Sequence, residues 1–318
     1  MAADDGLRAG SGERPDVRHP DVRHPDVRHP DVPPGQPAAA AYRPLVPAMR
    51  VLLYVAAVLV LLAGFQLFVF TDRTATYFAW TIAPPLAAAF LGAAYWASVA
   101  IEALAARQAL WANARIAVPT VLVFTVLTLA ATLNHLDKFH LGSEFALRTR
   151  FVTWAWIAVY ALVPVLMLIV LVVQARTPGS DPPRAAVLPG WLSGVLVVQA
   201  VGLFGLGVAL FAVPDQASPV WPWKLTTLVA QATGAWLISL GVAAGHAVLE
   251  RSARRLRPAA VGYVLLVVLQ CIALARYPHQ FPWGSASGIV YLVVLGTMLL
   301  TGTAGLVKGL PRPSPDQA

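Results

Sequence analysis

One short segment between two apolar stretches carries three side chains that can bind a metal or move a proton. His135, Asp137 and His140 lie within six residues of one another, and imidazole with carboxylate is a ligand set suited to zinc or iron. Residues five apart do not share a face of a regular helix, so a metal site would need the chain to leave the helix between them. At a helix end the same side chains also suit lipid headgroups and water. The sequence leaves both interpretations open.

Two aspartates recur in similar surroundings. Asp72 and Asp215 are each followed eight positions later by a tryptophan, Trp80 and Trp223, and the two copies are 143 residues apart. The other matching positions are Gly64, Leu67 and Phe68 in the first copy and Gly207, Leu210 and Phe211 in the second. A carboxylate placed in this way can contact a ligand or ion, or it can cap the next helix by accepting from free backbone N–H groups. The tryptophans are expected in the aromatic belt at the membrane interface.

These groups belong to loops that topology assigns to one side of a membrane. The predicted polar site on the outer face consists of Asp72, His135, Asp137, His140, Asp215 and His279, with an aromatic rim of Trp80, Trp221, Trp223 and Trp283. Short loops stay close to the end of a helix bundle, so these residues are predicted to converge on one shallow extracytoplasmic pocket. The identity of any metal or cofactor stays open.

Apolar helices must position these loops. Of the 318 residues, 58% are hydrophobic and 12% are charged, which is too apolar for a soluble domain. A spanning helix needs about 20 apolar residues, and the chain has eight such stretches. They cover residues 48–70, 78–105, 115–134, 151–175, 187–213, 222–249, 258–275 and 286–307. The sequence predicts an all-α polytopic membrane protein with eight transmembrane helices.

The basic residues predict an orientation. With the N-terminus inside, twelve basic residues lie near helix ends on the inner side and six on the outer side, as the positive-inside rule requires when both termini are cytoplasmic. This distribution also explains the net charge of +8 by topology and lipid contact. The lipid bilayer is the predicted partner, nucleic acid is not, and a small-molecule or ion ligand remains open, as does the oligomeric state.

Composition divides the chain into five parts. Residues 1–42 contain tandem Pro-Asp-Val-Arg-His repeats and are predicted to be a disordered cytoplasmic tail. Residues 43–176 hold the first four helices, residues 177–186 form a proline-rich linker, residues 187–308 hold the last four helices, and residues 309–318 form a cytoplasmic tail.

A second set of matching residues supports a duplication of the sequence. Arg115, Phe139, Gly142 and Ser143 match Arg257, Phe281, Gly284 and Ser285 at an offset of 142. Each half has an even number of helices, so the halves would enter the membrane from the same side as two parallel four-helix repeats.

Few ionisable residues lie inside the apolar stretches. Glu102 and His246 lie near the predicted cytoplasmic ends of their helices, and Glu250 follows. Such charges are candidates for function, but pairing with Arg107 or Arg251 at the inner interface is the simpler expectation. The sequence has no Walker loop, G-x-S-x-G, C-x-x-C or D-D-x-x-D motif. ATP hydrolysis, serine esterase chemistry and prenyl transfer therefore lack their usual signatures.

Three segments carry a resemblance. They are residues 78–82 (Phe-Ala-Trp-Thr-Ile) with Pro84 and Pro85, residues 221–223 (Trp-Pro-Trp), and residues 135–140 (His-Leu-Asp-Lys-Phe-His). These segments resemble multipass membrane proteins of actinobacteria that have no established activity. The resemblance covers residues 45–310. The resemblance implies a bacterial plasma membrane and transfers no functional residue.

Three functions fit these observations. The first is a small-solute or ion transporter, which the repeats and the paired aspartates favour. The second is a membrane enzyme or metal-dependent envelope factor that uses the outer histidines. The third is a non-catalytic interaction protein whose outer loops bind a partner. Transport is the preferred hypothesis, and an enzyme is not expected.

Overall fold

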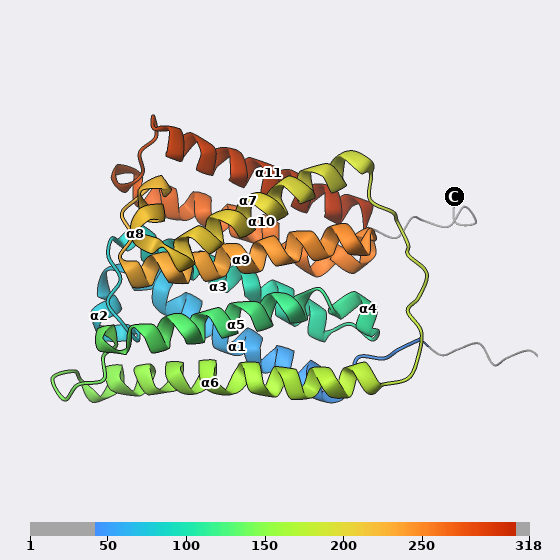
Figure 1. The fold of residues 1–318 in the computed structure, drawn as a ribbon, viewed down its shortest axis with the longest axis horizontal. Helices are drawn as coiled ribbons and strands as arrows, with labels where there is room; N and C mark the ends of the chain where they lie inside the picture. The colour runs from blue at the N-terminus through green and yellow to red at the C-terminus, as the bar shows by residue number, and fades with distance from the viewer. Residues whose placement is uncertain (1–41, 310–318) are drawn as a thin grey trace, which may run out of the picture. The chain divides into compact units, whose positions relative to one another are not determined.

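The computed structural model describes residues 42–309, and this part of the chain is almost wholly helical (Figure 1). Eight of its helices are long and apolar enough to cross a membrane. They are α1 (Pro47–Val69), α3 (Pro85–Ala106), α5 (Ala117–Asn134), α6 (Leu147–Arg176), α7 (Gly190–Ala212), α9 (Thr227–Glu250), α10 (Ala253–Arg276) and α11 (Ala286–Lys308). The predicted eight-helix, all-α membrane architecture is confirmed. The repeats of the N-terminal tail lie outside the described residues, as does the chain after Gly309.

Helices α3 and α9 begin five or more residues later than their predicted apolar stretches. Residues 78–83 precede α3 in a non-helical conformation, and Trp80 pairs with Phe139 in an isolated bridge. Pro84 disfavours helix at the residue before it, and Pro85 occupies the first helical position, where a missing N–H costs nothing. Helix α9 begins after Thr226, whose side chain accepts a hydrogen bond from the backbone N–H of Val229. Proline and the cap therefore set the helix starts.

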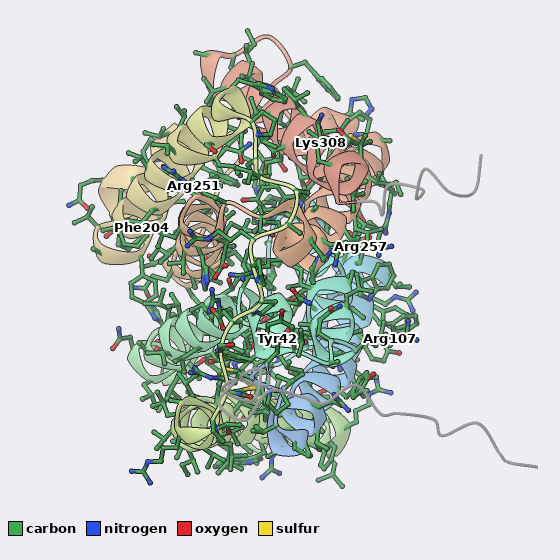
Figure 2. The ribbon with its side chains drawn as sticks, turned by 90° about the vertical axis from the view of Figure 1, so that its right-hand side faces the viewer. Tyr42, Arg107, Phe204, Arg251, Arg257 and Lys308 are labelled. Atoms are coloured by element: carbon green, nitrogen blue, oxygen red, sulfur yellow. The ribbon has the colours of Figure 1, made fainter. Side chains whose placement is uncertain are left out.

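The connections alternate between the two ends of the helix bundle. Residues 177–189 join α6 to α7 at one end, which we call the linker end; Figure 2 is viewed from this end and labels Arg107, Arg251, Arg257 and Lys308 there. The linker pairs with the chain before α1 through Tyr42 and Ser180. The short helical turns at the opposite end include α2 (Thr74–Tyr77), α8 (Pro214–Ala217) and the 3-10 turn Leu136–Lys138. The predicted outer residues all belong to this opposite end.

Helices α3, α5, α9 and α10 form the centre of the bundle. Helices α3 and α9 are the most buried of the eight. Helix α3 packs against α1 and α10, while α9 packs against α7 and α5. These contacts keep the same pattern when α1, α3, α5 and α6 are exchanged for α7, α9, α10 and α11. Helices α1, α6, α7 and α11 are the less buried ones and present most of the apolar surface to lipid.

Glycines permit the close packing of α1 on α3. A Cβ atom on Gly92 would lie 2.5 Å from the backbone nitrogen of Phe68, and one on Gly64 would lie 2.2 Å from the indole of Trp96. Small residues at such crossings let helix backbones approach closely in a membrane. The α1–α3 contact therefore depends on the absence of side chains at these two positions.

The α7–α9 contact has the same construction. A Cβ atom on Gly234 would lie 2.7 Å from the carbonyl oxygen of Gly207 and 3.0 Å from the backbone nitrogen of Phe211, and one on Gly207 would lie 2.7 Å from the backbone nitrogen of Ile238. These four residues follow Gly92, Gly64, Phe68 and Trp96 by 142 or 143 positions. The echo in the sequence thus falls on equivalent helix crossings.

Replacing Gly92 by valine is expected to destabilise the protein by about 1–3 kcal/mol, because the new side chain meets backbone that cannot rotate away. The thermal unfolding midpoint in detergent measures the change. Gly194→Val is the matched control, because nothing lies within 4 Å of a Cβ atom at Gly194. Equal midpoints for the two variants would contradict the close α1–α3 crossing.

Candidate functional site

The six predicted polar residues do not form a common cluster. Asp72, Asp137, Asp215 and His279 are exposed, His135 is half-buried, and His140 is buried. Within residues 42–309, no two of the six share a hydrogen bond or an ion pair. Nor does this part of the chain contain any group of three or more His, Cys, Asp or Glu side chains that could hold a metal ion. His135, Asp137 and His140 are thus not gathered into one ligand set in this part of the chain.

The polar partners of the aspartates are local. Asp137 pairs with its neighbour Lys138 at 2.9 Å, and Asp215 accepts from the hydroxyl of Thr227 at 3.3 Å. Thr227 is the first residue of α9. The contact of Asp215 resembles the predicted capping role in its location, although its partner is a side chain instead of a backbone N–H group.

His140 has a structural role. Its Nδ1 lies 3.0 Å from the carbonyl oxygen of Phe78, and its Nε2 lies 3.0 Å from the hydroxyl of Thr81. A neutral ring protonated on Nδ1 satisfies both contacts, by donating to the carbonyl and accepting from the hydroxyl. The backbone N–H of His140 also donates to the carbonyl of Ala79. His140 therefore fastens the loop after α5 to the segment before α3.

The stability of this loop contact is expected to fall in mild acid. Burial lowers the pKa of His140, so the folded protein binds the proton more weakly than the unfolded chain does. The stabilisation is therefore complete above the ordinary histidine pKa of about 6.5 and decreases as the pH falls below it. Unfolding midpoints at pH 7.5 and pH 5.5 should differ less in His140→Gln than in wild type. The exposed His279→Gln variant is the control and should retain the wild-type pH dependence; if the two variants behave alike, the assignment is wrong.

The tryptophans differ from the predicted rim. Trp80, Trp221 and Trp223 are buried, and only Trp283 of the four is exposed. Indole suits both a membrane interface and a packed core, and here the extended segments before α3 and α9 turn three of these rings inward. Trp80, Trp221 and Trp223 therefore pack inside the protein at this end of the bundle instead of presenting their rings at its surface.

The buried rings form one aromatic cluster in each half. Trp80 packs against Phe78, Phe139 and Trp156 with ring centroids 4.6–5.2 Å apart. The second cluster consists of Trp221, Trp223, Phe281 and Tyr291. Three members of the first cluster precede three members of the second by 143 or 142 positions: Phe78, Trp80 and Phe139 correspond to Trp221, Trp223 and Phe281. Repeated aromatic packing accounts for the repeated tryptophans.

A charge network at the linker end contains Glu250. Its carboxylate accepts from Arg255 at 2.7 Å and from Arg115, and His246 lies 3.2 Å away. Arg115 also pairs with Asp181 of the linker. Ion pairing was predicted at this end, with Arg107 or Arg251 as the partner. Glu250 does form ion pairs here, but its arginine partners are Arg115 and Arg255. The network joins the start of α5, the linker and the α9–α10 turn.

Glu102 differs from that pattern. Its side chain is 1% exposed and accepts one hydrogen bond, at 2.9 Å, from the hydroxyl of Ser98. Its other carboxylate oxygen, Oε2, is buried without a hydrogen-bond partner, and Glu102 forms no ion pair within residues 42–309. The predicted pairing with Arg107 does not occur. Since an isolated buried carboxylate is costly to keep in an apolar medium, Glu102 is the strongest candidate for function.

Glu102 lines a cavity of about 220 Å³ between α1, α3, α5 and α6. The α1 residues on its wall run from Ala56 to Gln66, which corresponds to about 15 Å along the helix axis. Leu62 and Phe151 also line it and are 56% and 72% exposed, so the cavity opens to the surface between α1 and α6. It extends from this opening inward to a carboxylate.

Aromatic side chains surround the deeper part of the cavity. Tyr95, Phe124, Trp156 and Tyr160 belong to its wall, and the hydroxyls of Tyr95 and Tyr160 are hydrogen-bonded at 2.7 Å. Tyr95 lies two helical turns from Glu102, so both side chains share one face of α3. A mostly apolar cavity with a few convergent polar groups is the usual form of a ligand site.

The cavity is closed toward the linker end. There the side chain of Gln174 on α6 accepts from the backbone N–H of Val46 at 2.9 Å and donates to the carbonyl of Pro44 at 3.0 Å. Leu53 of α1 and Met167 of α6 are fully buried in the same apolar cluster. Helices α1 and α6 therefore meet at the linker end, and the cavity opens between them beyond this contact.

The sequence contained a signal for the isolation of Glu102. Arg107 follows it by five residues, and positions five apart point to different sides of a helix. Pairing within α3 was thus disfavoured from the start. The cavity itself had no such signal, because residues from four helices build it.

Comparison with known proteins finds no match for this chain. No protein-family model, no curated protein and no solved structure matches it.

Proposed function

We propose that the protein is a membrane transporter for small organic cations, in which Glu102 binds a proton and a cation alternately. The observation that carries the proposal is the carboxylate of Glu102, which is buried, has an unpartnered oxygen and lines a cavity inside the apolar bundle. A buried negative charge needs a positive partner. Either a proton or a bound cation supplies it.

The cavity wall favours an organic cation over a metal ion. Metal ions such as Na⁺ and Ca²⁺ require several oxygen ligands, whereas Glu102 is the one carboxylate on this wall. The faces of Tyr95, Trp156 and Tyr160 attract an ammonium group through their π electrons. A small cation with an apolar body matches both features.

The arrangement of α1 and α6 supports alternating access. The cavity opens to the surface between α1 and α6 and reaches Glu102, while Gln174 ties α6 to Val46 and Pro44 at the linker end. A second state would separate the helices at the linker end and bring them together at the opposite end. When a cation binds the carboxylate on one side, Glu102 releases its proton there; on the other side a proton displaces the cation, so charge balances over the cycle.

Orientation, membrane and ancestry belong to the same proposal. Basic residues concentrated at the linker end support a cytoplasmic location for that end and for both termini. The resemblance to actinobacterial proteins supports a bacterial plasma membrane. Equivalent glycine crossings and aromatic clusters support an origin by duplication into two parallel four-helix repeats.

Uptake of benzyltrimethylammonium into proteoliposomes tests the transport proposal. An outward-directed proton gradient should drive uptake in wild type, and Glu102→Gln should reduce it by about tenfold to a hundredfold, the equivalent of one lost charge-assisted contact. Glu144→Gln makes the same chemical change on an exposed loop and should leave uptake unchanged.

A neutral ligand of the same shape separates charge from size. Wild type should neither bind nor transport 2,2-dimethylpropylbenzene in a manner that depends on Glu102. If Glu102→Gln transports the cation at the wild-type rate, or if wild type shows no uptake above empty vesicles, the proposal fails.

A further inference from the structure

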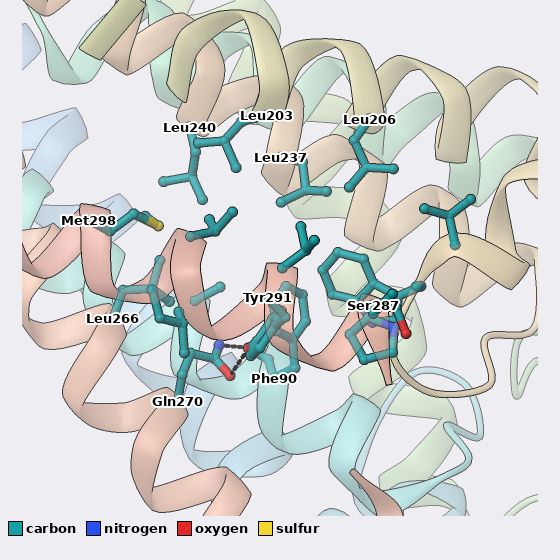
Figure 3. Close-up of a pocket in the computed structure, with 18 of the residues that line it drawn as sticks. Phe90, Leu203, Leu206, Leu237, Leu240, Leu266, Gln270, Ser287, Tyr291 and Met298 are labelled. Carbon is teal, nitrogen blue, oxygen red and sulfur yellow. Dashed lines mark hydrogen bonds between the residues drawn. The ribbon is translucent and has the colours of Figure 1, made fainter. Parts of the chain in front are cut away.

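A larger cavity lies in the second half of the bundle. It has a volume of about 540 Å³ and lies between α7, α9, α10 and α11, with Phe90 of α3 at one side (Figure 3). Figure 3 shows leucines 203, 206, 237 and 240 on one wall and Gln270 and Tyr291 on the other. This cavity has no part in the proposed cation cycle.

The two cavities occupy equivalent positions in the two halves. Four residues of the first, Val60, Ala63, Tyr95 and Phe124, precede four residues of the second, Leu203, Leu206, Leu237 and Leu266, by 143 positions in the first helix and 142 in the others. The polar residues are not retained. Leu237 stands at the position equivalent to Tyr95, and Ala244 at the position equivalent to Glu102. The second cavity is therefore suited to an apolar ligand, whereas the first is suited to a cation.

The polar group deep in the second cavity is already satisfied. The amide of Gln270 donates to the carbonyl of Phe90 at 3.1 Å, and its oxygen accepts from the hydroxyl of Tyr291 at 3.0 Å. Gln270 thus has little capacity left for a polar ligand, and the residues around it on the cavity wall are apolar. A dry apolar space of this kind suits hydrocarbon and not water.

The second cavity opens toward lipid between α7 and α11. These helices are joined where Gln199 donates to the hydroxyls of Thr297 and Thr301 at 3.1 and 3.4 Å, and the cavity lies beyond this contact, toward the opposite end. Val220 and Val290 line the cavity and are exposed. A chain entering from the bilayer would cross no polar barrier.

Polar groups occur at the end of the cavity that faces the opposite end of the bundle. The indole of Trp221 lines the cavity, and its N–H is buried with no hydrogen-bond partner in the described part of the chain. Ser285 and Ser287 line the same region, with hydroxyl oxygens 3.1 Å apart. A buried donor without a partner costs about 1–3 kcal/mol, which an acceptor oxygen on a ligand would recover.

We infer that the cavity between α7 and α11 binds one acyl chain of a bilayer phospholipid, with an oxygen at the ester end of that lipid accepting from the indole N–H of Trp221. The chain fills the apolar space between the leucines and Met298, and the ester lies at the depth of Ser285 and Ser287. The first cavity binds the transported cation, and the second holds a structural or regulatory lipid.

Photo-crosslinking tests this inference without any transport assay. The full-length protein is reconstituted with phosphatidylethanolamine that carries a diazirine in the middle of one acyl chain, and mass spectrometry maps the crosslinks. In wild type they should concentrate on cavity residues such as Leu206, Leu237 and Met298. Leu237→Trp fills the cavity and should reduce these crosslinks about tenfold.

Two further variants separate cavity binding from general lipid contact. Val198→Trp adds the same side chain on a surface of α7 that is 72% exposed and outside the cavity, and it should leave the crosslinks at the cavity unchanged. Trp221→Phe removes the indole donor but keeps an aromatic ring, and it should weaken crosslinking severalfold with an ester lipid but not with the matching ether-linked alkyl lipid that lacks the carbonyl. Crosslinks spread evenly over the lipid-facing residues, and insensitive to Leu237→Trp, would overturn the inference while leaving the Glu102 proposal intact.

Discussion

Replacing Glu250 by alanine is expected to lower the free energy of unfolding by about 3 kcal/mol, which is the usual cost of removing one partner from a buried ion pair. Glu250 is 4% exposed and pairs with both Arg115 and Arg255. Arg255 is equally buried, so its charge would remain in the protein with only the more distant Asp181, at 4.0 Å, and the carbonyl of Pro182. Thermal unfolding in detergent measures the loss.

Two variants identify the cause of this loss. Glu144→Ala removes the same atoms from an exposed loop and should change the free energy of unfolding by no more than about 0.5 kcal/mol. Adding Arg255→Ala to Glu250→Ala should recover part of the stability, because the stranded charge is then absent. A Glu250→Ala protein as stable as Glu144→Ala would show that the network does not hold the linker to the bundle.

Replacing Glu102 by leucine is expected to have the opposite effect on stability and to abolish transport. The substitution removes a buried oxygen that has no partner, so it should raise the free energy of unfolding by roughly 1–3 kcal/mol. Ser98 loses its acceptor but can turn to a carbonyl of the preceding helical turn. Benzyltrimethylammonium uptake should fall to the level of empty vesicles, because leucine binds neither proton nor cation.

This combination distinguishes a functional carboxylate from a structural one. A structural Glu102 would contribute to stability, and its leucine variant would unfold at a lower temperature. Ser98→Ala is the companion variant: it removes the one hydrogen bond of Glu102 and should change uptake while changing stability only slightly. If Glu102→Leu is both less stable and fully active, the carboxylate has no role in transport.

Local sequence was sufficient to predict the membrane helices. Eight apolar stretches predicted eight spans because apolar runs of about 20 residues have few alternatives to crossing a bilayer. The helix starts near Pro85 and Thr226 could also have been placed from proline and cap chemistry. These features depend on neighbouring residues only.

The candidate site required tertiary contacts that local sequence does not contain. The pairing of Arg115 with Glu250 joins residues 135 positions apart, and the cavity around Glu102 uses four helices. His135, Asp137 and His140 were predicted as a possible metal site from their residue types. The ring of His140 instead forms hydrogen bonds with Phe78 and Thr81. For the tryptophans, residue type alone could not separate an interface from a core, because indole suits both.

The repeat offset of 142–143 residues predicts more of the structure than the individual matching residues do. Asp72 and Asp215 first drew attention, but both are exposed and line neither cavity. The same offsets relate the glycine crossings, the aromatic clusters and the walls of the two cavities. The informative comparison is therefore between positions that have changed, such as Glu102 and Ala244.

Carbodiimide labelling of Glu102 is the most direct test of a cation site at this carboxylate. Diisopropylcarbodiimide enters apolar sites and adds a protonated carboxyl group across one of its N=C bonds, and the adduct rearranges to a stable N-acylurea that mass spectrometry locates. We predict that Glu102 is labelled in the reconstituted protein. Saturating benzyltrimethylammonium, at about ten times its dissociation constant, should slow the labelling about tenfold, because only about a tenth of the sites remain free.

The neutral 2,2-dimethylpropylbenzene provides the comparison in the same experiment, and it should give no such protection. A Glu102 that is labelled at the same rate with and without the cation, or that the neutral compound protects equally well, would contradict a cation site at this carboxylate.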